Sequence, residues 1–196
     1  MSTEVSYIYP ESTMQDTYVL SSSVSNFANN IFLKVGKDSS NAIARSILKN
    51  DFSNTTVPSN AYLEKASVKL VCQSGGFSSI GVYEIISDWN EISNWSNQPT
   101  YVPSPIYTYQ NINYIAGQKY EFEFTDLARF WLDSRKVNRG FALRVTDTLT
   151  INQITFFSSS YINSWERPEF YYKYKPGNKK QFNPILNEST GGVIIL

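Results

Sequence analysis

Short runs that alternate between apolar and polar residues constrain this fold more than any other feature of the sequence. In the run 68–72, Val68, Leu70 and Cys72 share one face, while Lys69 lies on the other. Alternation with a period of two is typical of strands that bury one face and expose the other. The same period recurs in four later runs, which are residues 120–124, 141–145, 154–156 and 170–175.

Turn residues separate these runs and indicate how the strands are connected. Many short strands with turns between them are typical of an antiparallel sandwich or barrel. One stretch, residues 125–132, has a different pattern: Thr125 is a predicted N-cap, and Leu127, Phe130 and Trp131 follow at helical spacing. We therefore expect an all-β fold with one short helix that covers an end of it. The turn signals are Gly36-Lys37-Asp38, Gly75-Gly76, Ala116-Gly117 and Asn138-Arg139-Gly140.

The composition excludes several classes of function. The 196 residues include no histidine, which removes the commonest general base and the histidine ligands of zinc. The single cysteine, Cys72, lies on the apolar face of its run, so we expect it to be buried. Lysine plus arginine and aspartate plus glutamate both number 17, and this balance argues against nucleic acid as a partner.

A tryptophan-rich stretch, DWNEISNWSNQP at residues 88–99, fits neither a strand nor a helix. It places Trp89 and Trp95 six residues apart and ends at Pro99. We expect a shaped loop whose large rings fold back over the core. We refer to residues 88–99 as the tryptophan loop.

The order of these features carries a family resemblance, whose pieces are residues 16–19, 26–27, 33–36, 45–49 with Phe52, 66–70, the tryptophan loop, 124–127 with Trp131, 138–144, 157–159 and 167–170. It resembles the DNRLRE-type domain, a jelly-roll β-sandwich related to carbohydrate-binding modules, over residues 7–175. The resemblance implies a binding or structural module. The hexapeptide that names the family is absent, and Asn50 replaces a usual apolar residue, so that strand is expected to hold a buried amide or a bulge.

The chain changes character after Lys175. Residues 1–175 are expected to form the jelly-roll sandwich, and residues 176–196 a C-terminal extension that begins with a turn-rich break. The extension ends in two glycines and an apolar, β-prone segment, which suits pairing with an open sheet edge of the same or another copy. The predicted assembly residues are Gly191, Gly192, Val193, Ile194, Ile195 and Leu196.

Two functions from different classes fit these features. Our first hypothesis is a non-catalytic structural protein that self-assembles through its terminal segments into a filament, appendage or coat, for example at a spore surface. The alternative is a carbohydrate-binding module that recognises a polysaccharide through exposed aromatic rings, with Trp165 as the best exposed candidate. The other ligand-binding candidates are Tyr101, Tyr107, Tyr109, Trp89 and Trp95.

The acidic residues do not indicate a catalytic site. Glu84, Asp88 and Glu91 lie near the tryptophan loop, but no pair of them is marked as convergent, so we expect no enzyme activity. We expect no cofactor and no metal, although the oxygen ligands Asp16, Asp38 and Asn41 leave a structural calcium open.

The sequence also gives expectations about location. Residues 1–20 lack the basic start and apolar stretch of a signal peptide, which favours cytoplasmic synthesis or a removed leader. No run has the length of a membrane span. We expect a location at the surface of a cell, spore or particle.

Deletion of residues 191–196 tests the assembly hypothesis. The truncated protein is expected to stay folded and monomeric, because the connecting strand is gone while the sandwich is intact. Light scattering and electron microscopy of both forms measure particle size. Assembly of the truncated protein to the same size as the full chain would contradict the hypothesis, and failure to fold would assign the strand to its own sandwich.

Overall fold

The computed structural model describes residues 5–9, 14–51, 61–147, 151–175, 185–187 and 192–194. In this part of the chain strands dominate, and α1 (Thr125–Leu132) is the one α-helix, so the all-β prediction is confirmed. Two short 3-10 turns, η2 (Trp95–Asn97) and η3 (Ser164–Glu166), lie in loops. The strands are β1 (Val5–Tyr9), β2 (Met14–Leu20), β3 (Phe32–Lys37), β4 (Ile43–Asn50), β5 (Tyr62–Ser74), β6 (Phe77–Glu84), β7 (Tyr107–Asn113), β8 (Lys119–Glu123), β9 (Phe141–Val145), β10 (Asn152–Phe157), β11 (Glu169–Lys175), β12 (Ile185–Asn187) and β13 (Gly192–Ile194).

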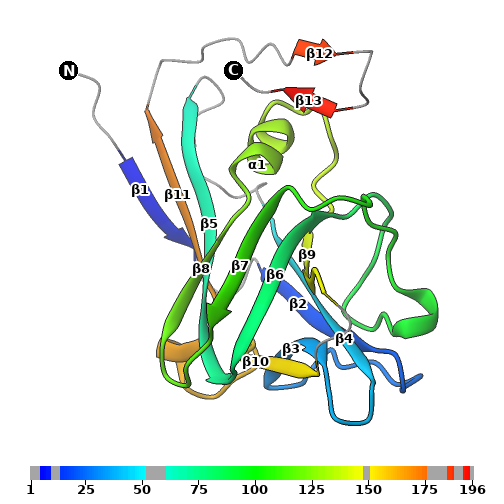
Figure 1. Cartoon of the computed structure of the whole chain (residues 1–196). Coiled ribbons are helices and arrows are strands. Elements are labelled where there is room, and N and C mark those ends of the chain that lie inside the picture. Colours follow the sequence, from blue (N-terminus) through cyan, green and yellow to red (C-terminus); the bar gives the residue numbers. More distant parts are fainter. Residues whose placement is uncertain are drawn as a thin grey trace.

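Eleven of the described strands form one curled antiparallel sheet (Figure 1). Their order is β1-β11-β5-β10-β3-β4-β9-β6-β7, with β2 added to β4 and β8 added to β5. The link between β5 and β10 is short and irregular, because only Thr155 and Phe156 of β10 pair with β5. The sheet can therefore fold over at this point, so that β11, β5 and β8 face β4, β9 and β6 across a core.

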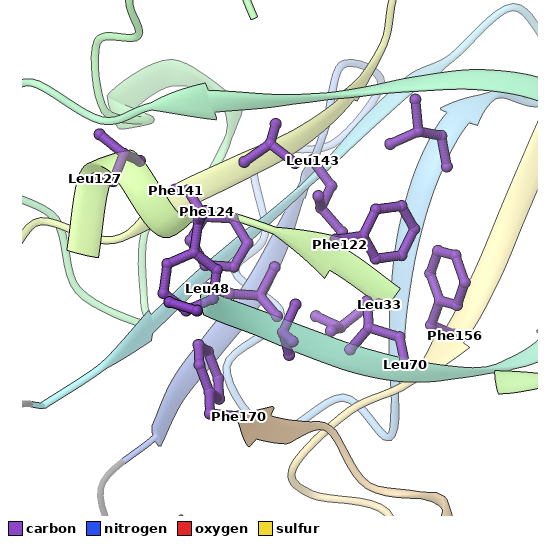
Figure 2. Close-up of a cluster of buried hydrophobic side chains, with 14 of the residues drawn as sticks. Leu33, Leu48, Leu70, Phe122, Phe124, Leu127, Phe141, Leu143, Phe156 and Phe170 are labelled. Atoms are coloured by element: carbon purple, nitrogen blue, oxygen red, sulfur yellow. The ribbon is translucent and has the colours of Figure 1, made fainter. Parts of the chain in front are cut away.

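The core is built from the apolar faces that the alternation predicted. Val68, Leu70 and Cys72 are fully buried, and the alternating residues of the later runs are buried as well, except for the partly exposed Tyr120. Figure 2 shows side chains from both layers meeting in one cluster. The labelled members of this cluster are Leu33, Leu48, Leu70, Phe122, Phe124, Leu127, Phe141, Leu143, Phe156 and Phe170.

Phe124 connects the two layers at the point where β8 ends and α1 begins. Its ring stacks on Phe141 of β9, with centroids 4.8 Å apart, and meets Phe170 of β11 edge-on at 5.7 Å. Its backbone N–H donates to the Ala66 carbonyl of β5 at 2.9 Å. Offset and edge-on contacts of this kind are the favoured geometries of aromatic pairs. Phe124 therefore ties β5, β9 and β11 to the start of the helix.

The helix has the predicted bounds but not the predicted cap. Phe124 occupies the N-cap position, and no side chain caps the helix there. The Thr125 hydroxyl donates to Glu123 Oε1 at 2.6 Å and accepts the Ala66 N–H at 3.0 Å. The prediction of Thr125 as N-cap was wrong because tertiary contacts with β5 use its hydroxyl. Trp131 is 8% exposed and lies in the core, as expected.

The environment of Asn50 decides between a buried amide and a bulge, the two alternatives that the sequence left open for β4. Its side chain is 2% exposed, and its amide donates to the Tyr172 hydroxyl at 3.2 Å. This strand therefore holds a buried amide.

The Asn138-Arg139-Gly140 turn meets the same strand: Gly140 has a φ of 76°, and a Cβ there would lie 2.2 Å from the Leu48 carbonyl oxygen. Only glycine fits this close approach.

Replacing Phe124 with alanine is expected to lower the free energy of unfolding by about 3–5 kcal/mol, because a fully buried ring between the layers would leave a cavity. Phe77→Ala is the matched control, since Phe77 is 67% exposed on β6 and its loss is expected to change stability by less than about 0.5 kcal/mol. Urea unfolding of both variants measures the difference. An equal loss of unfolding free energy in the two variants would contradict the conclusion that Phe124 joins the two layers.

Candidate functional site

The loop that joins β10 to β11 presents a tryptophan ring to solvent. Trp165 lies in η3 and is 82% exposed. Asn163 caps this turn: its Oδ1 accepts the Trp165 backbone N–H at 3.3 Å, and its amide donates to Glu166 Oε2 at 2.8 Å. Asparagine side chains favour turns because they bond to the backbone two residues on. The exposed ring therefore stands on a hydrogen-bonded turn.

Further contacts close this loop on itself. The Arg167 guanidinium donates to the carbonyl oxygens of Tyr161 and Ile162. The planar donor group of arginine suits two such acceptors at once. The Tyr161 ring packs against Phe157 of β10, with centroids 4.1 Å apart. The loop is thus tied both to its own carbonyls and to the end of β10.

A buried carboxylate from β2 holds the base of the loop. Ser159 donates its N–H to Asp16 Oδ2 at 2.8 Å and its hydroxyl to Asp16 Oδ1 at 2.7 Å. Asp16 is 2% exposed, and its own N–H donates to Glu91 Oε1 at 3.2 Å. Burial raises the pKa of Asp16 above its ordinary value; the two bonds from Ser159 oppose this rise, and the nearby Glu91 adds to it.

A second loop lies against the first. The Ser158 hydroxyl donates to the Asn30 carbonyl at 2.6 Å, and the Ser158 N–H donates to the Ile31 carbonyl at 3.1 Å. These bonds join the β10–β11 loop to the loop between β2 and β3. The two joined loops carry four exposed large apolar side chains, which are Val24, Ile31, Ile162 and Trp165.

The tryptophan loop covers the outer face of the sheet. Trp89, Trp95 and Tyr101 pack on a second apolar cluster that is separate from the main core. The indole N–H of Trp89 donates to the Arg139 carbonyl at 2.6 Å. The rings of Trp89 and Trp95 therefore fold back over the sheet as predicted, but onto this second cluster and not onto the main core. The buried residues beneath them are Val19, Ile47, Tyr83, Ile85 and Ala142.

Two arginines add charge to this outer face. The Arg45 guanidinium lies 4.5 Å from the ring centroid of Trp95 and 5.8 Å from that of Tyr101. Arg144 lies 5.2 Å from the Tyr101 centroid and 4.5 Å from that of Tyr83. Burial lowers the pKa of Arg45, and the charge of Arg144 lowers it further, whereas burial raises the pKa of Tyr101 to about 12. Stacking on aromatic faces holds both cations in place.

Tyr107 and Tyr109 use their hydroxyl groups inside the fold. Tyr107 donates to Asp126 Oδ2 of α1 at 3.1 Å, and Tyr109 accepts the Glu123 backbone N–H of β8 at 2.5 Å. Burial raises the pKa of both tyrosines. These contacts join β7, an edge of one layer, to β8 and α1 of the other layer. The two hydroxyls therefore close the sandwich between the edges of its layers.

The acidic residues near the tryptophan loop have separate partners. Glu84 pairs with Lys136 at 2.7 Å, Asp88 pairs with Arg139 at 2.9 Å, and Glu91 accepts the N–H of Asp16. Asp38, a calcium candidate, instead accepts bonds from Ser40 and Ala42 within its own turn. Within the described ranges, no three histidine, cysteine or acidic residues are grouped so that they could hold a metal ion. No helix in these ranges is long and apolar enough to cross a membrane.

The predicted assembly segment is described only in part. Gly192, Val193 and Ile194 form β13, which pairs antiparallel with β12 of the same chain. Gly191, Ile195 and Leu196 lie outside the described residues. Pairing of β13 with another copy stays a prediction.

Sequence reasoning missed the link between Asp16 and Ser159. It considered Asp16 only as a loop ligand for calcium. The alternation in β2 gives no clear signal, because Thr17 and Val19 are buried as well as Met14 and Tyr18, so both faces of this strand are covered. A carboxylate at an inward position of a strand needs hydrogen-bond donors from elsewhere in the fold.

Asp16→Asn tests the cost of the buried charge. Because the pKa of Asp16 is raised on folding, its ionisation destabilises the fold as the pH rises through the window above the ordinary carboxyl value. At pH 7 the asparagine variant is therefore expected to gain stability relative to the parent, and this gain is expected to shrink near about pH 3, where Asp16 is protonated in both states. Urea unfolding at both pH values measures it. A difference in unfolding free energy between variant and parent that does not change with pH would contradict the conclusion that ionisation of Asp16 destabilises the fold.

Comparison with known proteins gives the family. The model of carbohydrate-binding module family 96 matches residues 8–170, which is most of the chain. No curated protein matches it. The family match supports the alternative hypothesis, a carbohydrate-binding domain, better than the hypothesis of a self-assembling subunit. The chain belongs to carbohydrate-binding module family 96.

Proposed function

We propose that this protein is a non-catalytic module that binds a polysaccharide by stacking a sugar ring on Trp165. The family match supports binding of carbohydrate, and the exposure of Trp165 is the observation that carries the choice of site. An indole ring offers a large, rigid apolar face, and a pyranose ring presents C–H groups that pack on such a face. Because the turn under Trp165 is already hydrogen-bonded, little ordering is needed on binding.

The other aromatic candidates are less suited to this task. Trp89 and Trp95 pack on the second apolar cluster, and Tyr107 and Tyr109 bond inside the fold. A sugar that used these rings would have to displace contacts that the folded protein already makes. Trp165 has no such competing contact among those described, apart from the backbone bonds of its turn.

Groups beside Trp165 supply the polar side of the proposed site. Ser160, Asn163 and Ser164 are exposed, while Glu166 and Arg167 are partly exposed. Hydroxyl, amide and charged side chains are the groups that orient a sugar once its ring is stacked. The proposed site is therefore the exposed surface of residues 160–167.

Several finer points stay proposals. The likeness to the DNRLRE type rests on the order of motifs, and a location at the surface of a cell, spore or particle would bring the module to its polysaccharide. Self-assembly through residues 191–196 is a second proposal that is compatible with binding. The absence of catalysis would appear as no new reducing ends when the protein is incubated with the polysaccharides it binds.

Trp165→Ala is expected to weaken binding by about tenfold or more, because tryptophan anchors contribute at least that much at binding sites. Affinity electrophoresis against a panel of neutral and acidic polysaccharides identifies a ligand, and isothermal titration then measures the affinity. Trp165→Phe, which keeps an aromatic face, is expected to retain part of it.

Two controls make the outcome specific. Phe77→Ala removes an aromatic ring that is 67% exposed on β6, and it is expected to leave the affinity unchanged. Trp95→Ala tests the outer face of the sheet. Loss of binding in the Trp95 variant but not in the Trp165 variant would move the site to the tryptophan loop, and a parent protein that binds no polysaccharide would overturn the proposal.

A further inference from the structure

The hydrogen bonds between Asp16 and Ser159 require a carboxylate to be buried, which disfavours the folded state. Asp16 is almost fully buried, and among the residues that the structure describes the charged group that acts on its carboxylate is another acid, Glu91. β4 places the apolar Leu48 opposite Asp16, and the β10–β11 loop contributes the uncharged Ser159. A buried carboxylate without a cation disfavours the folded state. The carboxylate accepts two hydrogen bonds, and both come from Ser159, in the loop that carries Trp165.

The two bonds fix the first turn of that loop. Ser159 is held through both its backbone N–H and its hydroxyl, which determines its position and its side-chain rotamer together. Ser158, the residue before it, is bonded to Asn30 and Ile31. Downstream, the Arg167 guanidinium donates to the Tyr161 and Ile162 carbonyls of the same loop. Asp16 is thus a point at which a strand of the sandwich directly restrains this loop.

We propose that Asp16 is a positioning residue for the carbohydrate site, and that its two hydrogen bonds to Ser159 hold the loop so that Trp165 is presented to the ligand. This inference rests on the proposed function. It assigns to Asp16 no contact with the sugar. The buried carboxylate is retained at a cost in stability because an ionised acceptor holds Ser159 more firmly than a neutral one.

The charge state of Asp16 therefore sets how firmly the loop is held. When the carboxylate is ionised, both oxygens accept from Ser159. Protonation turns one oxygen into a donor, so one of the two bonds must reverse or be lost, and the remaining bond is uncharged. The affinity for polysaccharide is expected to fall by about threefold as Asp16 is protonated, which corresponds to a difference of about 0.65 kcal/mol.

Four variants test the proposal. Asp16→Asn keeps the shape but not the charge, and it is expected to be more stable than the parent at pH 7. It is expected to bind about threefold more weakly than the parent at pH 7, and this difference is expected to disappear at acid pH, where Asp16 of the parent is protonated. Ser159→Ala removes one of the two bonds and is expected to weaken binding to a similar extent. Ser46→Ala is the matched control, because it removes a buried hydroxyl that bonds to the Lys34 carbonyl, away from the loop. Glu91→Gln is expected to keep a pH-dependent affinity whose midpoint moves to lower pH, because the charge of Glu91 contributes to the raised pKa of Asp16; loss of the pH dependence in this variant would assign the titration to Glu91.

A readout without ligand separates this proposal from the function on which it rests. The indole N–H signal of Trp165, assigned by its loss in Trp165→Phe, reports on the mobility of the loop in nuclear magnetic resonance. Greater mobility is expected in Asp16→Asn and Ser159→Ala, and in the parent at acid pH, but not in Ser46→Ala. If Trp165→Ala binds as the parent does, the proposed site is wrong. The mobility measurements still test whether Asp16 holds the loop in position.

The proposal is overturned by any of three results. The first is an Asp16→Asn protein whose Trp165 signal and mobility match those of the parent across the pH range. The second is a pair of Asp16→Asn and Ser159→Ala proteins that bind as tightly as the parent while Trp165→Ala binds weakly. A loss of affinity in Ser46→Ala equal to that in Ser159→Ala would likewise show general destabilisation instead of positioning.

Discussion

The stacking of aromatic rings between the two layers is the interaction on which the rest of this structure depends. Phe124 meets Phe141 and Phe170 from different strands, and the same residue begins the helix. Because protein interiors are close-packed, the rings set the spacing of the layers and hence where the loops leave them. The loops between β10 and β11 and between β2 and β3 join each other at an edge that this packing defines.

The outer face of the sheet shows why aromatic content alone does not locate a binding site. Trp89, Trp95 and Tyr101 cover an apolar cluster there, and Arg45 and Arg144 stack against the rings. Such contacts shield apolar side chains from water and hold two like charges near each other. Of the four tryptophans, three are committed to the core or to this cover, and Trp165 is the one that is mostly exposed.

Buried polar groups connect the sandwich to its loops. Asp16 bonds to Ser159, Thr125 bonds to Ala66 and Glu123, and Asn50 bonds to Tyr172. Each of these side chains interrupts an apolar or helical pattern, and each is satisfied by a partner distant in sequence or on a neighbouring element. Buried polar groups are costly unless they are hydrogen-bonded, so they specify which segments must meet.

The sequence by itself determined strands β5, β8, β9, β10 and β11, the short helix and the faces of these strands that are buried, because alternation and turn chemistry act over a few residues. It also identified the tryptophan loop and named Trp165 as the best exposed ring. Only the tertiary structure decided that Asp16 reaches Ser159, that Thr125 bonds to β5 and does not cap its helix, and that Tyr107 and Tyr109 close the sandwich. These pairs are separated by up to 143 residues, and no local pattern encodes a contact that depends on how the layers fold together.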